Sequence, residues 1–229
     1  MNSEPTAPAG LRQSFLFADL SGFTAMTEVH GDEEAADVAE GFADAVQLIL
    51  PGYRAEEVKR IGDAVMLRTE EASRAVELAL RVATEVGEQH GSPTVRVGIN
   101  TGTAIERGGD WFGATVNVAA RVAGAAAGGQ VLLTKSTRDA AGQLDSIEFL
   151  PRGRRKLRNV SKPVQLYEAV AGGEATSNGL PVDPVCRMAV DPIHSVGSLR
   201  YRGVVFFFCS FECADAFARD PGRFGRAER

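Results

Sequence analysis

Two aspartates interrupt short apolar segments that otherwise have the composition of buried strands. Asp19 lies in the segment FLFADL and Asp63 in the segment VKRIGDAVML, and both flanks are rich in apolar residues. A carboxylate rarely enters such surroundings unless it is paired, hydrogen-bonded or bound to a cation. Magnesium is commonly held by one or two carboxylates together with phosphate oxygens. The two aspartates therefore predict one shared cation site near a phosphate compound, although either residue alone could be an ordinary turn or capping residue.

The bulk composition limits the class of protein. The chain has 229 residues, 44% hydrophobic and 24% charged, which suits one globular core with room for a second small one. A net charge of −5 gives no reason to expect nucleic acid as a partner. No apolar run approaches the roughly 18–20 residues that cross a bilayer, and residues 1–10 lack a signal pattern. We therefore expect a cytoplasmic protein without a membrane span.

The order of the predicted elements indicates the fold class. The elements follow the split βαβ order of ferredoxin-like folds. This order is a strand, a helix, two strands joined by a tight turn at Gly62, a second helix and another strand. We expect an α+β domain with an antiparallel or mixed sheet and helices mainly on one face. The predicted strands are 14–19, 56–60, 64–69, 94–101, 131–133, 147–150 and 164–170, with a hairpin at 105–111 and helices at 32–50, 75–86, 114–123 and 136–141.

The chain is expected to divide into two units. A stretch rich in Gly, Ala, Ser and Asn has the composition of a linker. We expect a first domain at 11–171, a linker at 172–179 and a second unit at 180–226. The second unit is too short for a large core, and such units usually need a metal, a disulfide or a partner surface.

The third predicted helix carries two polar residues among alanines and valines. Asn117 and Arg121 are four residues apart, so they project from one face. The planar guanidinium of an arginine suits phosphate oxygens, and an asparagine can orient a hydroxyl group. This pattern favours a ligand site over the alternative of a solvated helix face. Lys59 and Asp110, taken alone, could be a solvated lysine and a turn residue.

Four phrases of the sequence together resemble the catalytic domain of class III nucleotidyl cyclases. They are FADLSGFT at 17–24, KRIGD at 59–63, VGINTG at 97–102 and DWFGATVNVAAR at 110–121, and KPVQLY at 162–167 is similar to the closing strand of that family. The phrases occur in the order and spacing of the family, and the resemblance covers about residues 11–171. One phrase would be weak evidence, whereas four in register are specific.

The resemblance implies a role for each of these residues in a cyclase reaction. Asp19 and Asp63 would hold two Mg²⁺ or Mn²⁺ ions per active site, with the carbonyl of Leu20 as a further metal ligand. Lys59 and Asp110 would recognise the purine, and this pairing favours ATP over GTP.

The remaining implied roles concern the ribose and the phosphates. Asn117 would hold the ribose, and Arg121 would stabilise the charge on the α-phosphate. The loop at Gly22, Phe23 and Thr24 would offer backbone N–H groups to phosphate. The ribose 3′-oxygen would attack the α-phosphorus, giving 3′,5′-cyclic AMP and pyrophosphate, with two metal ions assisting the attacking and leaving oxygens.

In this family the site is built between two chains, so the resemblance implies a homodimer with two shared active sites. Asp19 and Asp63 would come from one chain, and the other named side chains from its partner. Some relatives carry an arginine where this chain has Thr103. The basic run RGRRKLR at 152–158 is the expected substitute, although it could equally be a solvated surface.

All three cysteines lie after residue 185. Cys186 lies in DPVCRM, and Cys209 and Cys213 lie in FFFCSFEC. Three converging thiolates would suit Zn²⁺, copper(I) or another soft metal, and the alternative is simple burial of free thiols. The segment at 181–226 resembles the YHS domain, a metal-associated module related to TRASH domains. A fourth ligand is not evident, and His194 is only a weak candidate.

Several functions remain open at the level of sequence. The leading expectation is an adenylate cyclase tuned by metal or redox state through the C-terminal unit. The alternatives are a guanylate cyclase, a catalytically silent nucleotide-binding scaffold, and a metal sensor. Because the cyclase-like segment starts within about a dozen residues of the first residue, regulation is expected from the C-terminal unit, the dimer equilibrium or a separate protein.

Overall fold

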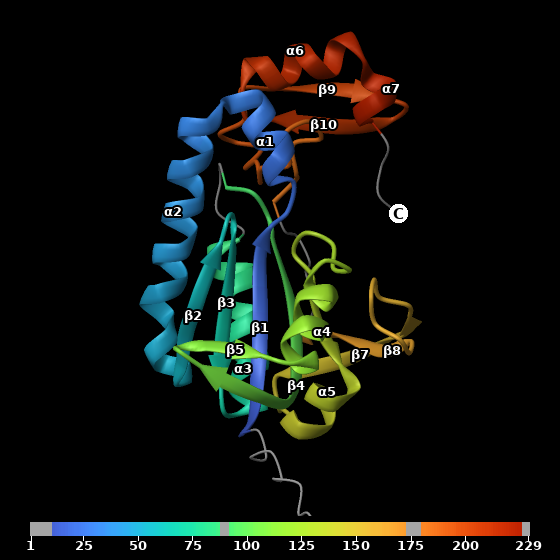
Figure 1. The fold of residues 1–229 in the computed structure, drawn as a ribbon. Helices are drawn as coiled ribbons and strands as arrows, with labels where there is room; N and C mark the ends of the chain where they lie inside the picture. Colours follow the sequence, from blue (N-terminus) through green and yellow to red (C-terminus); the bar gives the residue numbers. More distant parts are fainter. Residues whose placement is uncertain (1–10, 88–91, 173–179, 226–229) are drawn as a thin grey trace, which may run out of the picture.

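The computed structural model describes residues 11–87, 92–172 and 180–225 (Figure 1). Within these ranges no helix combines the length and the apolar character that crossing a membrane requires. The first part of the chain contains β1 (Leu11–Leu20), α1 (Phe23–His30), α2 (Asp32–Ile49), β2 (Ala55–Ile61), β3 (Ala64–Thr69), α3 (Ala72–Arg81), β4 (Val95–Arg107), β5 (Asp110–Phe112) and α4 (Ala114–Ala123). The rest contains β6 (Val131–Thr134), α5 (Lys135–Ala141), β7 (Ile147–Arg155), β8 (Val164–Ala171), β9 (Gly197–Tyr201), β10 (Val204–Phe208), α6 (Phe211–Arg219) and α7 (Pro221–Phe224).

Strand β1 lies near the middle of the large sheet. The described strands follow the order β2-β3-β1-β4-β6-β8-β7, and β5 pairs with β4 off this path. β1 is antiparallel to both of its neighbours, whereas β4 and β6 are parallel. The predicted mixed sheet and α+β class are therefore confirmed.

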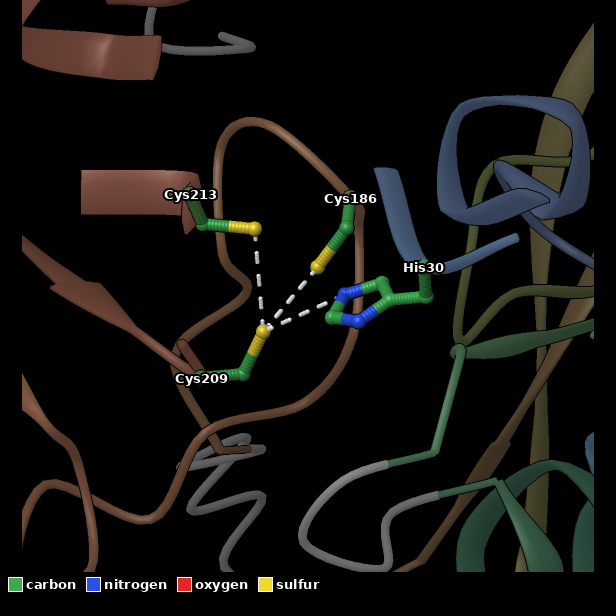
Figure 2. Close-up of side chains that lie close together, drawn as sticks. All are labelled: His30, Cys186, Cys209 and Cys213. Atoms are coloured by element: carbon green, nitrogen blue, oxygen red, sulfur yellow. Dashed lines mark hydrogen bonds between the residues drawn. The ribbon is translucent and has the colours of Figure 1, made fainter. Parts of the chain in front are cut away.

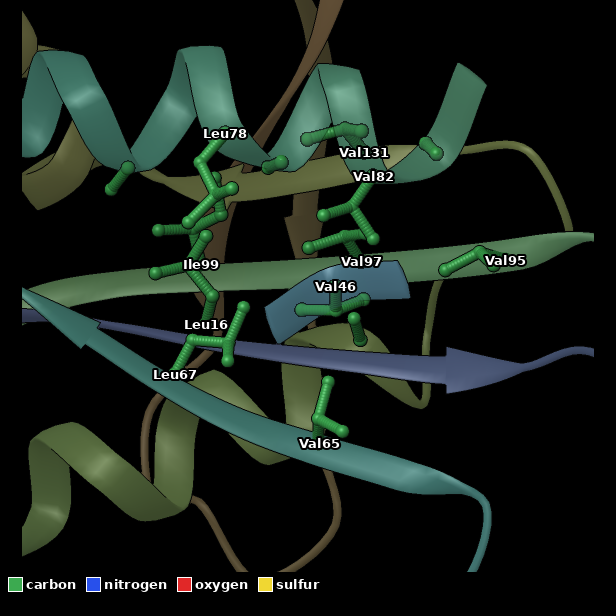
Figure 3. Close-up of a cluster of buried hydrophobic side chains, with 14 of the residues drawn as sticks. Leu16, Val46, Val65, Leu67, Leu78, Val82, Val95, Val97, Ile99 and Val131 are labelled. Carbon is green, nitrogen blue, oxygen red and sulfur yellow. The ribbon is translucent and has the colours of Figure 1, made fainter. Parts of the chain in front are cut away.

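Successive residues of β1 face two different cores, because the side chains of a β-strand point alternately to opposite faces of the sheet. Leu16, Ala18 and Leu20 face the larger core, which α2 and α3 cover. Figure 3 shows part of this core, where Val46 of α2 and Leu78 of α3 meet the strand side chains. Phe15 and Phe17 face the opposite core, which α4 covers. The helices thus lie mainly on one face, as predicted, and α4 covers the other.

Two glycines of β4 let α4 approach the sheet closely. A Cβ added at Gly98 would lie 1.9 Å from the backbone nitrogen of Ala123, and one at Gly102 would lie 2.7 Å from Oγ1 of Thr115. The side-chain amide of Asn100 donates to the Thr115 carbonyl at 2.9 Å. These contacts fix the helix that carries Asn117 and Arg121.

The structure differs from the predicted elements at two places. The segment after Asp19, predicted as a loop, forms helix α1. The sequence did not predict this helix because it is only eight residues long and has a glycine at each end, a pattern typical of a loop. The predicted strand at 94–101 and the start of the hairpin form one continuous strand, β4. Residues 173–179 of the predicted linker and residue 226 of the second unit lie outside the described residues.

The C-terminal unit lies beyond the end of β1, against α1 (Figure 1). It contains the β9–β10 hairpin and α6, with Phe208 and Phe217 buried inside. Met26 of α1 is fully buried in the same apolar cluster. A backbone hydrogen bond of 2.8 Å from Ala189 to the Ser92 carbonyl adds a second connection. The core of the small unit is therefore completed by the first domain.

We expect Gly98→Ala to destabilise the protein by about 1–3 kcal/mol, because the added methyl group would push α4 away from β4. This corresponds to a Tm loss of roughly 2–4 °C per kcal/mol in a chain of this size, measured by thermal unfolding. The matched control is Gly41→Ala in α2, where an added Cβ meets nothing within 4 Å. An equal loss of Tm in both variants would contradict the close packing of α4.

Candidate functional site

The register of the sheet brings Asp19 and Asp63 together. Asp19 lies near the end of β1 and pairs with Ala64 of β3, whereas Asp63 occupies the turn just before that strand. Both side chains are partly buried. Burial and the neighbouring Asp19 carboxylate raise the pKa of Asp63 to about 6. Two carboxylates share one partly desolvated position, an arrangement that attracts a cation.

Arg96 is an additional residue of this site that the sequence reasoning missed. It faces Asp19 across the β1–β4 ladder, and its Nε donates to Oδ2 of Asp19 at 2.7 Å, with a second bond from Nη2. The guanidinium therefore supplies a positive charge to the carboxylate pair. The sequence held one indication of this role, because Arg96 is a charged residue between two valines of a predicted strand.

Lys59 and Asp110 form an ion pair although 51 positions separate them in the sequence. Nζ of Lys59, on β2, donates to Oδ2 of Asp110, on β5, at 2.6 Å. The other carboxylate oxygen accepts the backbone N–H of Trp111 at 2.8 Å. The hydrogen bond from Lys59 lowers the pKa of Asp110. The two side chains thus lie side by side and are partly exposed.

Asn117 and Arg121 are exposed on α4. Within the described residues, no hydrogen bond or ion pair joins either side chain to the aspartate pair or to the Lys59–Asp110 pair. The structure thus gathers the predicted residues into two pairs and leaves the helix residues pointing into solvent.

The predicted phosphate loop forms the N-terminal end of α1. Leu20 ends β1, and Gly22 adopts a left-handed conformation with φ of 84° as the N-cap. Phe23 and Thr24 open the helix. A Cβ at Gly22 would lie 2.4 Å from Cγ of Arg187 in the C-terminal unit, so the loop directly contacts that unit.

The position at which some relatives carry a triphosphate arginine lies in β4. It is Thr103, whose carbonyl accepts a hydrogen bond of 2.7 Å from Thr115. The basic run expected to replace that arginine begins in β7. Arg152 pairs with Glu168 of β8. Arg154 and Arg155 belong to β7, whose bounds extend beyond the predicted strand.

The three cysteines converge at a single point (Figure 2). Sγ of Cys209 lies 3.2 Å from Sγ of Cys186 and 3.8 Å from Sγ of Cys213. The thiols are free. Hydrogen bonds from Cys186 and Cys209 hold the pKa of the Cys213 thiol well below its usual range, whereas hydrogen bonding to Cys186 raises the pKa of Cys209.

A fourth residue, His30, joins the cysteines from the end of α1. Its Nε2 lies 3.8 Å from Sγ of Cys209, and the four ligand atoms all lie within 4.8 Å of one another. His30 is therefore a fourth candidate ligand that was not evident from the sequence, and only the tertiary contact reveals it. His194 instead pairs with Asp191 at 2.8 Å on the exposed surface.

Two acidic residues lie next to the cluster of His30 and the three cysteines and position parts of it. Nδ1 of His30 lies 3.5 Å from Oε1 of Glu34, one turn along in α2. Asp183 is fully buried, and its two carboxylate oxygens accept backbone N–H groups from Val185 at 2.8 Å and Cys209 at 2.9 Å. Burial raises the pKa of Asp183. Asp183 therefore ties together the two segments that carry Cys186 and Cys209.

Comparison with known proteins agrees with this geometry. Residues 12–169 match the family described as "Adenylate and Guanylate cyclase catalytic domain", and residues 182–228 match the YHS domain. A "pH-sensitive adenylate cyclase" of Mycobacterium tuberculosis is 36% identical over 176 residues, which covers 75% of this chain and 44% of the relative. An "Adenylate cyclase" of Streptomyces griseus is 39% identical over 106 residues, covering 46% of this chain and 27% of the relative.

A solved structure of adenylate cyclases from Trypanosoma brucei in their monomeric state has a TM-score of 0.63 and 25% identity, covering 73% of this chain and 90% of that chain. The chain spans less than half the length of the two curated relatives. The large domain, with its carboxylate pair and its Lys59–Asp110 pair, has the fold and the sequence of one known group of enzymes. The chain therefore belongs to the class III adenylate and guanylate cyclase family and carries a C-terminal YHS domain.

Proposed function

We propose that this chain is an adenylate cyclase that converts ATP to 3′,5′-cyclic AMP and pyrophosphate. The observation that carries the choice of ATP is the Lys59–Asp110 pair, whose Nζ and Oδ2 atoms are 2.6 Å apart. A lysine donates to an acceptor such as adenine N1, and an aspartate accepts from the exocyclic amine. Guanine presents the opposite donor and acceptor pattern at these positions, so the same pair would be mismatched. The proposal therefore favours ATP over GTP.

Asp19 and Asp63 fit the Mg²⁺ or Mn²⁺ ions that the family implies. Two partly buried carboxylates, whose burial and mutual repulsion raise the pKa of Asp63, form a site of hard oxygen donors. The carbonyl of Leu20 would be a third ligand. When bound, the two ions would supply Lewis-acid stabilisation to the attacking and leaving oxygens. Arg96 donates two hydrogen bonds to Asp19 and so orients its carboxylate.

The other residues would bind and orient the substrate. Asn117 would hold the ribose, and Arg121 would stabilise charge on the α-phosphate. Backbone N–H groups at Gly22, Phe23 and Thr24 would bind phosphate oxygens at the positive end of α1. In the reaction the ribose 3′-oxygen forms a bond to the α-phosphorus and passes its proton to water, while the bond from the α-phosphorus to the pyrophosphate oxygen breaks and pyrophosphate departs.

We further propose that the active site is shared between two copies of the chain. Asn117 and Arg121 are exposed and make no contact with the aspartates of their own chain through a hydrogen bond or ion pair of the described residues. A symmetric homodimer would complete two sites, each taking its aspartates from one chain and its purine-binding, ribose-binding and α-phosphate-binding residues from the other.

Purified protein should release cyclic AMP from ATP with Mg²⁺ or Mn²⁺ and much less cyclic GMP from GTP. Lys59→Ala and Asp110→Ala should each lower the ratio of kcat/KM for ATP to that for GTP by roughly 10- to 100-fold, because a hydrogen bond to a charged group is lost. Arg60→Ala, which changes an exposed neighbour on β2, is the control and should keep the ratio.

Equal use of GTP by the unsubstituted protein would favour a guanylate cyclase, and intact ATP binding without product would favour the silent scaffold.

Mixing two inactive variants should restore activity if the site is shared. In a mixed dimer of Asp63→Ala and Arg121→Ala chains, one site carries both substitutions and the other carries neither. A one-to-one mixture should therefore recover about one quarter of the original activity. A mixture of Asp63→Ala with Asp19→Ala should recover none, because both changes affect the same half. No recovery in the first mixture, with dimers present, would exclude the shared site.

Asp63→Asn should change the response of the protein to divalent cations. Without metal, removing a like charge beside Asp19 should stabilise the fold by about 1 kcal/mol after allowance for solvent screening. Mn²⁺ at about 100 times its Kd should raise the Tm of the unsubstituted protein by roughly 5–10 °C, and this increase should disappear in the variant. Asp37→Asn, on the exposed side of α2, is the control. A persistent Mn²⁺ shift in Asp63→Asn would show that the metal binds elsewhere.

A further inference from the structure

The position of His30 is not explained by cyclase chemistry. It ends α1 of the catalytic domain, yet its ring lies among three thiols of the C-terminal unit (Figure 2). Its side chain is only 12% exposed. A histidine that packed there for apolar contact alone would not need a nitrogen directed at a sulfur, so the arrangement indicates a common ligand for the four side chains.

The distances fit a tetrahedral zinc site. Two thiolates on one zinc ion, each at about 2.3 Å, lie ~3.8 Å apart, and a thiolate and an imidazole nitrogen lie ~3.6 Å apart. The observed separations from Sγ of Cys209 are 3.8 Å to Cys213, 3.8 Å to Nε2 of His30 and 3.2 Å to Cys186. Of these three separations, the one between Cys186 and Cys209 must widen by about 0.6 Å to reach the zinc geometry. Three sulfurs and one imidazole are donors that zinc accepts readily.

The groups around the four donors are arranged as they commonly are around a metal. Metal-binding histidines usually present their second nitrogen to a carboxylate, which fixes the ring orientation. Glu34 occupies this position, 3.5 Å from Nδ1 of His30. Asp183 is buried and orients the backbone of both Cys186 and Cys209 by accepting their N–H groups, at 3.4 Å and 2.9 Å. The four candidate donors are therefore themselves oriented by neighbouring carboxylates.

The donors come from four places along the chain and from two domains. Cys186 and Cys209 lie in the loop and the hairpin end of the C-terminal unit, Cys213 lies in the first turn of α6, and His30 belongs to the catalytic domain. The same helix α1 buries Met26 against the C-terminal unit and, at its other end, holds Gly22 against Arg187. An ion at this point would thus join the two domains through an eight-residue helix.

We propose that His30, Cys186, Cys209 and Cys213 form a Cys₃His zinc site that fastens the C-terminal unit to helix α1 of the catalytic domain. The site does not depend on the proposed cyclase activity. Its consequence for regulation does rest on that function, because the opposite end of α1 is the proposed phosphate loop. Zinc occupancy would fix α1 at one end and so limit the movement of Gly22, Phe23 and Thr24 at the other.

The first test measures metal binding by the full-length chain in reducing buffer. The unsubstituted protein should bind one equivalent of Zn²⁺, and its Co²⁺ form should have the visible absorption of a tetrahedral site with thiolate ligands. His30→Ala should weaken zinc binding by more than the roughly 10- to 100-fold that loss of an outer partner costs, and it should change the Co²⁺ spectrum. His30→Cys should retain binding. His194→Ala, which changes an exposed histidine of the C-terminal unit, should behave as the unsubstituted protein.

The second test asks whether the ion joins the two domains. Trp111 is the only tryptophan of the chain, and it is buried in the catalytic core against Phe15. Its fluorescence therefore reports unfolding of the catalytic domain. Zinc should raise the Tm measured by this signal in the unsubstituted protein and in His30→Cys, but not in His30→Ala. A metal held by the cysteines alone would leave the two histidine variants alike.

Two results would overturn the proposal. One is unchanged zinc affinity and an unchanged Co²⁺ spectrum in His30→Ala. The other is failure of the reduced, folded protein to bind zinc at all, with a Cys186–Cys209 disulfide forming instead on oxidation. Neither readout uses cyclic nucleotide production, so loss of the cyclase hypothesis and loss of the zinc site would be recognised separately.

Discussion

Pairing of β1 with a strand on each side is the constraint on which the other features depend. The register with β3 sets Asp19 beside the turn that carries Asp63, and the register with β4 sets it opposite Arg96. A strand buried on both faces cannot slip by one residue without exchanging its two cores, so the carboxylate pair is located by hydrophobic packing. The positive charge of Arg96 then reduces the cost of placing two acids together.

The same strand also determines where the two domains meet. β1 ends at Leu20, and the left-handed backbone at Gly22 starts α1 toward the C-terminal unit. A side chain at Gly22 would collide with Arg187, so close contact between the domains requires the glycine. Met26 then completes the apolar core of a unit that is small for independent stability. The catalytic domain and the YHS domain thus share buried surface as well as a chain connection.

The two ends of α1 are suited to different chemistry. At one end, carboxylate oxygens and backbone N–H groups provide hard donors and an anion site, which suit magnesium and phosphate. At the other end, three sulfurs and an imidazole provide soft donors, which suit zinc. This difference allows one short helix to lie between two proposed metal sites without exchange of their ions. It also gives the YHS domain a physical route to the proposed nucleotide site, through a helix that contacts both.

Much of this protein could be predicted from its sequence because the relevant signals are local. Short apolar runs predicted the strands around both aspartates, and the spacing of Asn117 and Arg121 placed them on one helix face. Converging cysteines were also foreseeable from their clustering after residue 185. Helix α1 was not predicted as a helix, and Arg96 and His30 were not predicted as parts of a site, because each of these two residues acts through a residue distant in sequence. His30 and Cys209 are 179 positions apart.

Sequence alone determined which residue types were present and their periodicity, whereas only the packing of the C-terminal unit on α1 decided that a histidine of one domain meets the thiols of the other.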